Sequence, residues 1–226
     1  INTALGSQSM RDTTTGTNNV AVGNDCMLYN TTGYSNVAVG DFALGAITGN
    51  TASNGIYNAV VGYRSLKANQ SGGENSSLGS ETLASNISGN KNVAIGNEAL
   101  FYNESGSENV AIGVKALQNI VDKNVNCAVG SLALQNLSTG FNNTALGQTA
   151  GQTLTSGNNN TYIGHEADVQ SGGTAEDNVV VLGNGSVTTL YCAATSITSP
   201  SDERDKTNIQ DIDYGVDFIN DLRPVS

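Results

Sequence analysis

The sequence predicts an all-β fold, a parallel β-roll or β-solenoid in which each coil of the backbone corresponds to one 17-residue repeat. The first observation is a repeated motif close to Asn-x-Ala-(Val/Ile/Leu)-Gly. Its glycines are 17 residues apart in every interval between regular copies except one. The second is that each regular copy begins with Asn, and the third is another glycine seven positions before most motif glycines. The motif glycines lie at 6, 23, 40, 62, 79, 96, 113, 130, 147 and 164.

The motif itself is expected to form a short strand. In Asn92–Gly96, Val93 and Ile95 fall on one face and Ala94 on the other. Glycine at the strand end suits a corner with positive φ, and the second glycine suits another corner. We therefore expect two short strands and two turns per coil. With a looser eleventh copy that ends at Gly183, stacked strands about 4.8 Å apart would give a rise of roughly 48 Å.

The Asn column is the strongest candidate for a structural ladder. If each coil lies in register on the next, its Asn side chains are stacked, and amide groups can then donate and accept along the column. Each such bond contributes about 1 kcal/mol net. The alternative is that Asn is only a turn former. The column consists of Asn19, Asn36, Asn58, Asn75, Asn92, Asn109, Asn126, Asn143 and Asn160.

The two faces of the strand predict how chains associate. One coil has only a Val or Ile pair and a Leu to bury, which is little for an independent core. We expect the Ala column on the other face to admit a second sheet, and so predict a homotrimer. The alternative is a monomeric solenoid whose Ala stripe faces solvent. This column includes Ala21, Ala38, Ala94, Ala111, Ala128 and Ala145.

Composition and charge narrow the possible partners. Charged residues are 13% of the 226-residue chain, and the net charge is −11. This charge removes the attraction that drives binding to nucleic acid or to anionic lipid surfaces. The sequence contains no apolar run long enough to insert into a membrane. It also contains no nucleotide-binding, zinc-protease or serine-hydrolase motif, so no cofactor and no metal are expected.

Other single residues carry little functional signal. His165, the one histidine, is expected in a solvated turn rather than as a ligand or general base. Cys26 and Cys127 fall in repeat columns and are interpreted as buried fillers. The one longer interval, between Gly40 and Gly62, places an insertion at 45–55, whose central part, 46–54, is the best candidate for a protruding loop.

The repeat is followed by a segment of different character. We divide the chain into a shaft at 1–186, an extended connector at 187–201 and a charged segment at 202–226. In the last segment, apolar residues recur every three or four positions, which is typical of an amphipathic helix, and Asp213 could cap it. These residues are Ile209, Ile212, Val216, Ile219 and Leu222.

The repeat motifs resemble those of a known family. Asn19–Gly23, Asn36–Gly40, Asn92–Gly96 and Asn109–Gly113 resemble the head repeats of trimeric autotransporter adhesins, which form parallel β-rolls packed as trimers. The 17-residue period is longer than that family's and is closer to the repeats of phage tail-fibre proteins. The resemblance covers about residues 1–183.

Two later segments resemble the S74 peptidase family, the intramolecular chaperone at the end of many phage tail fibres. They are Ser201–Ile209 and Ile219–Val225. The resemblance implies that the chaperone assembles the trimer and then cuts the Ser201–Asp202 bond, with Ser201 as nucleophile and Lys206 as its base. Asp205 departs from the family, and a carboxylate beside Lys206 favours the charged lysine, which opposes the role of base. The alternative is that 202–226 is a trimerising cap.

Taken together, the repeat and the two resemblances predict a structural segment of a virion fibre, a phage tail fibre that attaches the particle to its host. The expected partners are two further copies of the chain, other virion tail proteins, and a glycan or protein receptor on the host surface. The alternatives are a glycan-degrading tailspike and a trimeric adhesin on a bacterial cell surface. At most, the chain would be an enzyme toward itself, at Ser201–Asp202.

Overall fold

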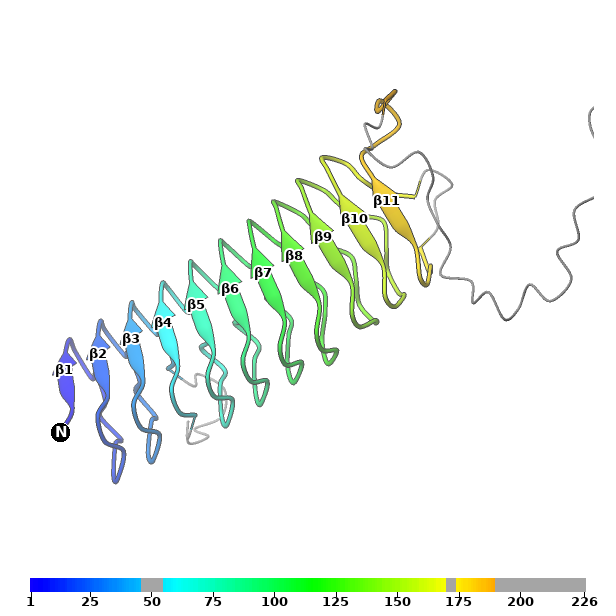
Figure 1. Ribbon diagram of the computed structural model, residues 1–226. Coiled ribbons are helices and arrows are strands. Elements are labelled where there is room, and N and C mark those ends of the chain that lie inside the picture. The colour runs from blue at the N-terminus through cyan, green and yellow to red at the C-terminus, as the bar shows by residue number, and fades with distance from the viewer. Residues whose placement is uncertain (46–54, 170–173, 190–226) are drawn as a thin grey trace, which may run out of the picture. The chain divides into compact units, whose positions relative to one another are not determined.

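The structure, a computed structural model, describes residues 1–45, 55–169 and 174–189. The chain divides into two units, Ile1–Thr188 and Thr189–Ser226. The first contains all of the repeat and consists of coils stacked along one direction (Figure 1). The expected loop at 46–54 and the C-terminal segment at 202–226 lie outside the described residues, as does the expected connector from residue 190 onward.

Eleven short strands form one parallel sheet in chain order, each paired only with its neighbours in the sequence. The described residues contain no helix, so the predicted parallel all-β solenoid is confirmed for them. The strands are β1 Thr3–Leu5, β2 Val20–Val22, β3 Val37–Val39, β4 Ala59–Val61, β5 Ser76–Leu78, β6 Val93–Ile95, β7 Val110–Ile112, β8 Cys127–Val129, β9 Thr144–Leu146, β10 Thr161–Ile163 and β11 Val180–Leu182.

Equivalent residues of the repeat lie side by side throughout. Val93 of β6 pairs with Val110 of β7, its equivalent in the next copy of the motif. The longer interval that contains the insertion does not disturb this register, because Val37 pairs with Ala59 across it. In the looser eleventh copy Thr161 pairs with Val180, which places Val179 rather than Asn178 in the Asn column.

The expectation of two strands per coil is wrong. In the described residues each coil has one strand, and turns and bends make up most of the remainder, with isolated bridges such as Thr139–Ser156 and Ser156–Ala175. The reason is that left-handed backbone recurs in every coil. In the coil of β6, Lys91, Glu98 and Leu100 have φ angles of 57°, 56° and 53°, which interrupt extended structure. The turns still stack, and the Leu100 N–H donates to Ala116 O at 3.1 Å.

The two glycines of a coil meet two requirements, an unusual φ angle and the close approach of the next coil. Gly40, at the end of β3, has a φ of 139°, a region that L-residues with side chains rarely adopt. Gly72, from the second column, has no such φ, but a Cβ there would lie 2.4 Å from Gly89 O. A Cβ on Gly40 would likewise lie 2.4 Å from Gly62 O, so glycines of both columns permit the close approach of consecutive coils, and Gly40 also permits the backbone corner.

The predicted inner and outer faces of the strand are reversed in the structure. Ala38, Ala94 and Ala111 are completely buried, whereas flanking residues such as Val37 and Ile95 are exposed. The coil is narrow, and its interior is already filled by a column from the opposite turn, so only a small side chain fits on the inner side of the strand. This column contains Met10, Met27, Leu44, Leu66, Leu83, Leu100, Leu117 and Leu134.

One pair of substitutions shows how narrow the interior is. In β10 the inward position is Tyr162 instead of Ala, and it is completely buried. The neighbouring coil has Gly151 where the eight preceding coils have Leu or Met. A Cβ on Gly151 would lie 2.9 Å from Tyr162 Cδ2 and 2.7 Å from Leu134 Cδ2. The larger residue on one side is thus accommodated by a glycine on the other.

Candidate functional site

The outward face of the sheet carries an unbroken aliphatic column. It is formed by the third residue of each strand, and in the eleven strands neither outward-facing position carries a charge. Leu78 is 52% exposed and Leu146 is 50% exposed. We call this set the outer aliphatic column: Leu5, Val22, Val39, Val61, Leu78, Ile95, Ile112, Val129, Leu146, Ile163 and Leu182.

The column is accompanied by the first residue of each strand, which is Val in five strands and Thr, Ala, Ser or Cys in the others. Where Ala59 and Ser76 replace the larger valine, a hollow of about 210 Å³ opens beside Val61, Leu78 and Ile95. Continuous apolar surface of this kind is unusual on a soluble monomer and is typical of an interface. The sheet is therefore a candidate surface for association.

Behind this face, the Asn residues form a hydrogen-bonded ladder. Asn19 Oδ1 accepts the Asn36 backbone N–H at 2.9 Å and its side-chain amide at 3.2 Å. The Asn36 amide also donates to Gly55 O at 2.8 Å. Each buried amide thus joins the strand of one coil to the corner of the next, so that polar groups inside the coil are satisfied.

The same bonds recur along the column with one variation. Between Asn92 and Asn109 only the backbone N–H donates, at 3.0 Å. At the far end, Asn160 Oδ1 accepts the N–H of Val179 at 3.0 Å, so the ladder ends without an unpaired acceptor. Side-chain pairs join Asn36 to Asn19, Asn58 to Asn36, Asn75 to Asn58, Asn92 to Asn75, Asn126 to Asn109, Asn143 to Asn126 and Asn160 to Asn143.

A second buried Asn column was not predicted from the sequence. The Asn86 amide donates to Asn69 Oδ1 at 2.8 Å, and the Asn103 amide donates to Asn86 Oδ1 at 3.0 Å. In the next coils this column becomes Ile120, Leu137 and Leu154, all buried. The signal was present, because these residues all lie seven positions after a motif glycine; the change from polar to apolar residues concealed it.

The inward positions also contain a small cluster of hydroxyl groups that was not predicted. Ser77 takes the place of Ala in β5, and its hydroxyl lies 2.7 Å from that of Ser65. Ser65 is in turn 2.6 Å from the Thr82 hydroxyl, which donates to Gly79 O at 3.2 Å. All three residues are buried. Their mutual hydrogen bonds allow polar side chains to replace Ala within the core.

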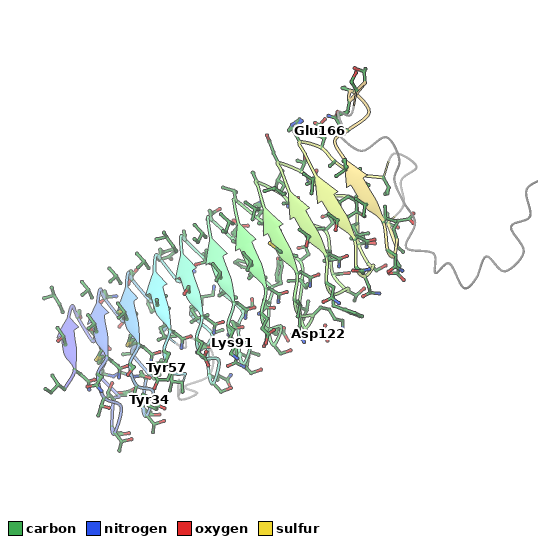
Figure 2. The ribbon with its side chains drawn as sticks, in the orientation of Figure 1. Tyr34, Tyr57, Lys91, Asp122 and Glu166 are labelled. Atoms are coloured by element: carbon green, nitrogen blue, oxygen red, sulfur yellow. The ribbon has the colours of Figure 1, made fainter. Side chains whose placement is uncertain are left out.

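The single residues considered in the sequence fall in different places. His165 is exposed, and its Nδ1 lies 3.8 Å from Glu166 Oε2. Cys26 is completely buried, and this burial raises the pKa of its thiol to about 11. Cys127 faces outward from β8 and is only partly buried, so its interpretation as a buried filler is wrong. Figure 2 shows a further feature, Tyr34 beside Tyr57, with ring centroids 5.5 Å apart.

Several carboxylates of the shaft pair with cations or amides. Glu81 lies 4.0 Å from Lys67, and Glu98 lies 3.7 Å from Lys115. Asp41 accepts a hydrogen bond from Asn24 at 3.1 Å. Among the residues that the structure describes, no group of three His, Cys, Asp or Glu side chains could hold a metal ion. Ser201, Asp202 and Lys206 lie outside the described residues.

Comparison with protein-family models, with curated proteins and with solved structures finds no match to this chain. In the part of the chain that the structure covers, there is no helix long and apolar enough to cross a membrane. The features that carry a functional argument are therefore the outer aliphatic column, the stacked coils behind it, and the corners between the strands.

Proposed function

We propose that this chain is a structural segment of a virion fibre, a phage tail fibre in which three copies associate along their length and help to attach the particle to a host surface. The observation that carries the proposal is the outer aliphatic column, which runs without a charged interruption over all eleven strands. Burial of one Leu, Val or Ile contributes about 1.5–3 kcal/mol. A repeated contact of this kind would hold the copies together along the shaft.

The association is proposed through the face opposite to the one first expected. The Ala column is inside the coil and is completely buried at Ala38, Ala94 and Ala111, so it offers nothing to a neighbour. The Val, Ile and Leu residues of the other face provide the contact instead. Three identical sheets around one axis would each present this column to the other two, which is the closed arrangement that symmetric assembly favours.

The shaft has the properties that a fibre requires. Every coil is bonded to the next through strand, turn and buried Asn side chains, so stretching or bending it must break several hydrogen bonds together. Three parallel chains would also present three copies of any surface feature, and weak contacts would then add through effective concentration. A glycan or protein on the host surface and the other tail proteins of the virion are the proposed partners.

The second unit is proposed to assist assembly. On the S74 resemblance, Lys206 would take the proton of the Ser201 hydroxyl, whose oxygen would attack the Ser201 carbonyl carbon. The bond to the Asp202 nitrogen would break, Lys206 would return the proton to that amine, and water would hydrolyse the acyl–oxygen bond that is left. The test is intact mass spectrometry of the parent and of Lys206→Ala after expression. The parent is expected to lose the segment that begins at Asp202, and the variant to keep it. Identical C-terminal ends in both proteins would reject self-cleavage.

The assembly is tested by sedimentation equilibrium of the full chain. For Lys206→Ala, which is expected to stay uncleaved, we expect a mass close to three times the chain mass of 23.2 kDa, and for the cleaved parent three times the mass of its shortened chain. Ile95→Asp places a charge in the outer aliphatic column and is expected to shift the population toward monomer, because the buried carboxylate would be unpaired. Ile87→Asp is the matched control, since Ile87 is 37% exposed and Ile95 is 38% exposed. A monomeric parent, or equal effects of the two variants, would contradict the proposal.

The alternative functions give different results in simple assays. A glycan-degrading tailspike would release new reducing ends from host capsule or lipopolysaccharide, whereas a fibre segment would not. The acids Glu81 and Glu98 each lie within 4.0 Å of a lysine, whereas glycoside hydrolysis uses a pair of carboxyl groups that act on the sugar. A bacterial surface adhesin would instead be recovered with the outer membrane of the producing cell.

A further inference from the structure

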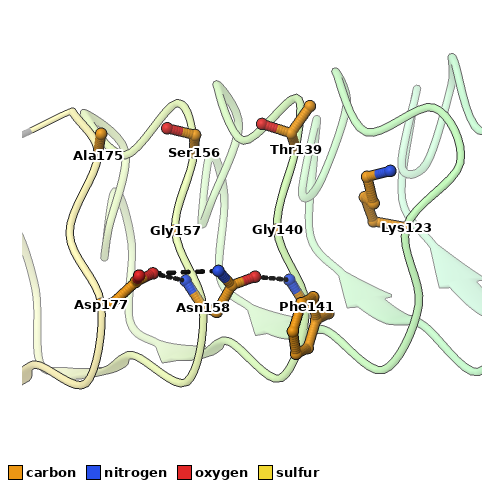
Figure 3. Close-up of a pocket in the computed structure, with 9 residues that line it drawn as sticks. All are labelled: Lys123, Thr139, Gly140, Phe141, Ser156, Gly157, Asn158, Ala175 and Asp177. Atoms are coloured by element: carbon orange, nitrogen blue, oxygen red, sulfur yellow. Dashed lines mark hydrogen bonds between the residues drawn. The ribbon is translucent and has the colours of Figure 1, made fainter.

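A groove lies at the corners of the last coils, away from the strands (Figure 3). One wall carries Thr139, Ser156 and Ala175, and the other carries Phe141, Asn158 and Asp177. Gly140 and Gly157 form the floor between them, and Lys123 stands at one end. The groove has a volume of about 310 Å³. This is near the lower limit of small-ligand sites and suits a single ring.

The groove combines a glycine floor, which most coils share, with a lysine that replaces this glycine in one coil. The floor glycines are common to most coils, since a Cβ on Gly140 would lie 2.1 Å from Gly157 O. In one regular copy of the repeat this glycine is replaced, by Lys123. Its side chain therefore rises where the other coils have none, and its ammonium group lies 3.1 Å from Asp122. The lysine thus marks one end of the groove (Figure 3).

The polar wall is held in place by hydrogen bonds between coils. Asn158 Oδ1 accepts the Phe141 N–H at 3.2 Å, and Asp177 Oδ1 accepts both the Asn158 N–H at 2.6 Å and the Asn158 amide at 3.1 Å. Phe141 interrupts this series of polar residues, and the residue is 49% exposed. The result is an exposed aromatic ring on a backbone that the neighbouring coils hold fixed.

The chemistry of these groups indicates the kind of ligand. The face of an aromatic ring is weakly negative, so it attracts the weakly positive C–H groups on the apolar face of a ligand. The hydroxyls of Thr139 and Ser156 and the second oxygen of Asp177 have no hydrogen-bond partner in the described part of the chain, so they remain free for hydroxyl groups. The cation at Lys123 is already paired, and the chain has a net charge of −11, which disfavours an anion.

We propose that this groove binds one neutral pyranose ring of a glycan, with Phe141 against the C–H face of the ring and Asp177 with the hydroxyls of Thr139 and Ser156 at its edge. The inference deepens the proposed function, since it names the chemical class of the host-surface partner and a place where it binds. The affinity expected of so open a site is low, with a dissociation constant of about 1–10 mM for a single sugar. Three copies in one fibre would raise it by effective concentration.

The test is saturation-transfer difference NMR of the full chain with uncharged methyl glycosides of glucose, galactose, mannose and N-acetylglucosamine. At least one is expected to bind, and Phe141→Ala is expected to weaken that binding about tenfold or more, because a ring that the sugar covers is lost. Tyr102→Ala is the matched control, since Tyr102 is also 49% exposed and lies outside the groove. It is expected to leave binding unchanged.

Phe141→Leu guards against loss of folding, because it keeps an apolar side chain while removing the aromatic face. It is expected to weaken binding about tenfold with an unchanged circular dichroism spectrum. Three results would overturn the inference: binding of none of the four glycosides, equal losses in the Phe141 and Tyr102 variants, or a preference for methyl glucuronide over methyl glucoside. Sedimentation of each protein separates the two proposals, since a trimer that binds no sugar contradicts only the groove, and a monomer that binds sugar through Phe141 contradicts only the fibre.

Discussion

The middle coils and the later coils of the shaft use the same backbone around different interiors. Around Asn69, Asn86 and Asn103 the column beside the second corner is a chain of buried amides. From Ile120 onward the same column is aliphatic. At the junction, Asn103 Oδ1 is buried without a hydrogen-bond partner in the described part of the chain. A coil can therefore close around either kind of contact, but a boundary between the two leaves a polar group unpaired.

The largest effect is expected when a single polar residue is placed in the apolar column of the later coils. Leu137→Asn would place an amide between Ile120 and Leu154, both completely buried. It would lose the burial of Leu and leave donors unpaired, so we expect the free energy of unfolding to fall by about 3–5 kcal/mol. Urea unfolding at one fixed protein concentration measures it, since assembly makes stability depend on concentration. A loss below about 1 kcal/mol would show that this column tolerates either chemistry at any position.

The reverse substitution in the polar coils has a smaller expected effect. Asn86→Leu removes the amide that donates to Asn69 and accepts from Asn103, and leaves Asn69 Oδ1 unpaired as well. The added apolar surface offsets part of the cost, so we expect a loss of about 2–4 kcal/mol in the same urea measurement. Asn119→Leu is the control for the chemical change, because the Asn119 side-chain amide is partly exposed and makes only a 3.5 Å hydrogen bond to Asn136 Oδ1 in the described part of the chain. Similar losses at both sites would argue against a role for the buried column.

A titratable group in the early coils gives an effect of about 1 kcal/mol. Burial raises the pKa of Cys26 to about 11 in the folded chain, from 9.0 for the free thiol. Because the folded state disfavours the thiolate, the stability is complete below pH 9 and is lost as the pH rises toward 11. We expect a decrease of about 1 kcal/mol at pH 10. Cys26→Ala should remove this part of the pH dependence, and an unchanged profile would contradict the assignment to Cys26.

The smallest effect is expected at the junction itself. Asn103→Leu removes the unpaired Asn103 oxygen but leaves Asn86 Oδ1 without its donor, so the boundary only moves by one coil. We expect a change within about 1 kcal/mol, clearly less than that of Asn86→Leu. Hydrogen exchange of the neighbouring amides would check it. If Asn103→Leu and Asn86→Leu lowered the free energy of unfolding equally, the position of the boundary between amide and aliphatic residues would not determine stability.

The repeat period made most of the shaft predictable. When identical residues recur at one spacing, a backbone that completes one coil per repeat places them next to one another. The register of Val93 with Val110 follows directly from it. The number of strands per coil did not follow, since it depends on left-handed residues such as Glu98 and Leu100, which are not of a type that favours that conformation. The polar column at Asn69 and Asn86 follows the same period, but its change from amide to aliphatic residues along the chain concealed it.

The sequence by itself determined the coil length, the parallel stacking, the Asn column and the two faces of each strand. Only the tertiary structure decided which face is inside. Alternation distinguishes Val93 and Ile95 from Ala94 but does not say which side has room. That depends on the opposite turn, where Leu100 and Leu117 already fill the narrow interior and leave space only for Ala. The larger apolar residues therefore face outward, and this reversal is the physical basis of the proposed assembly.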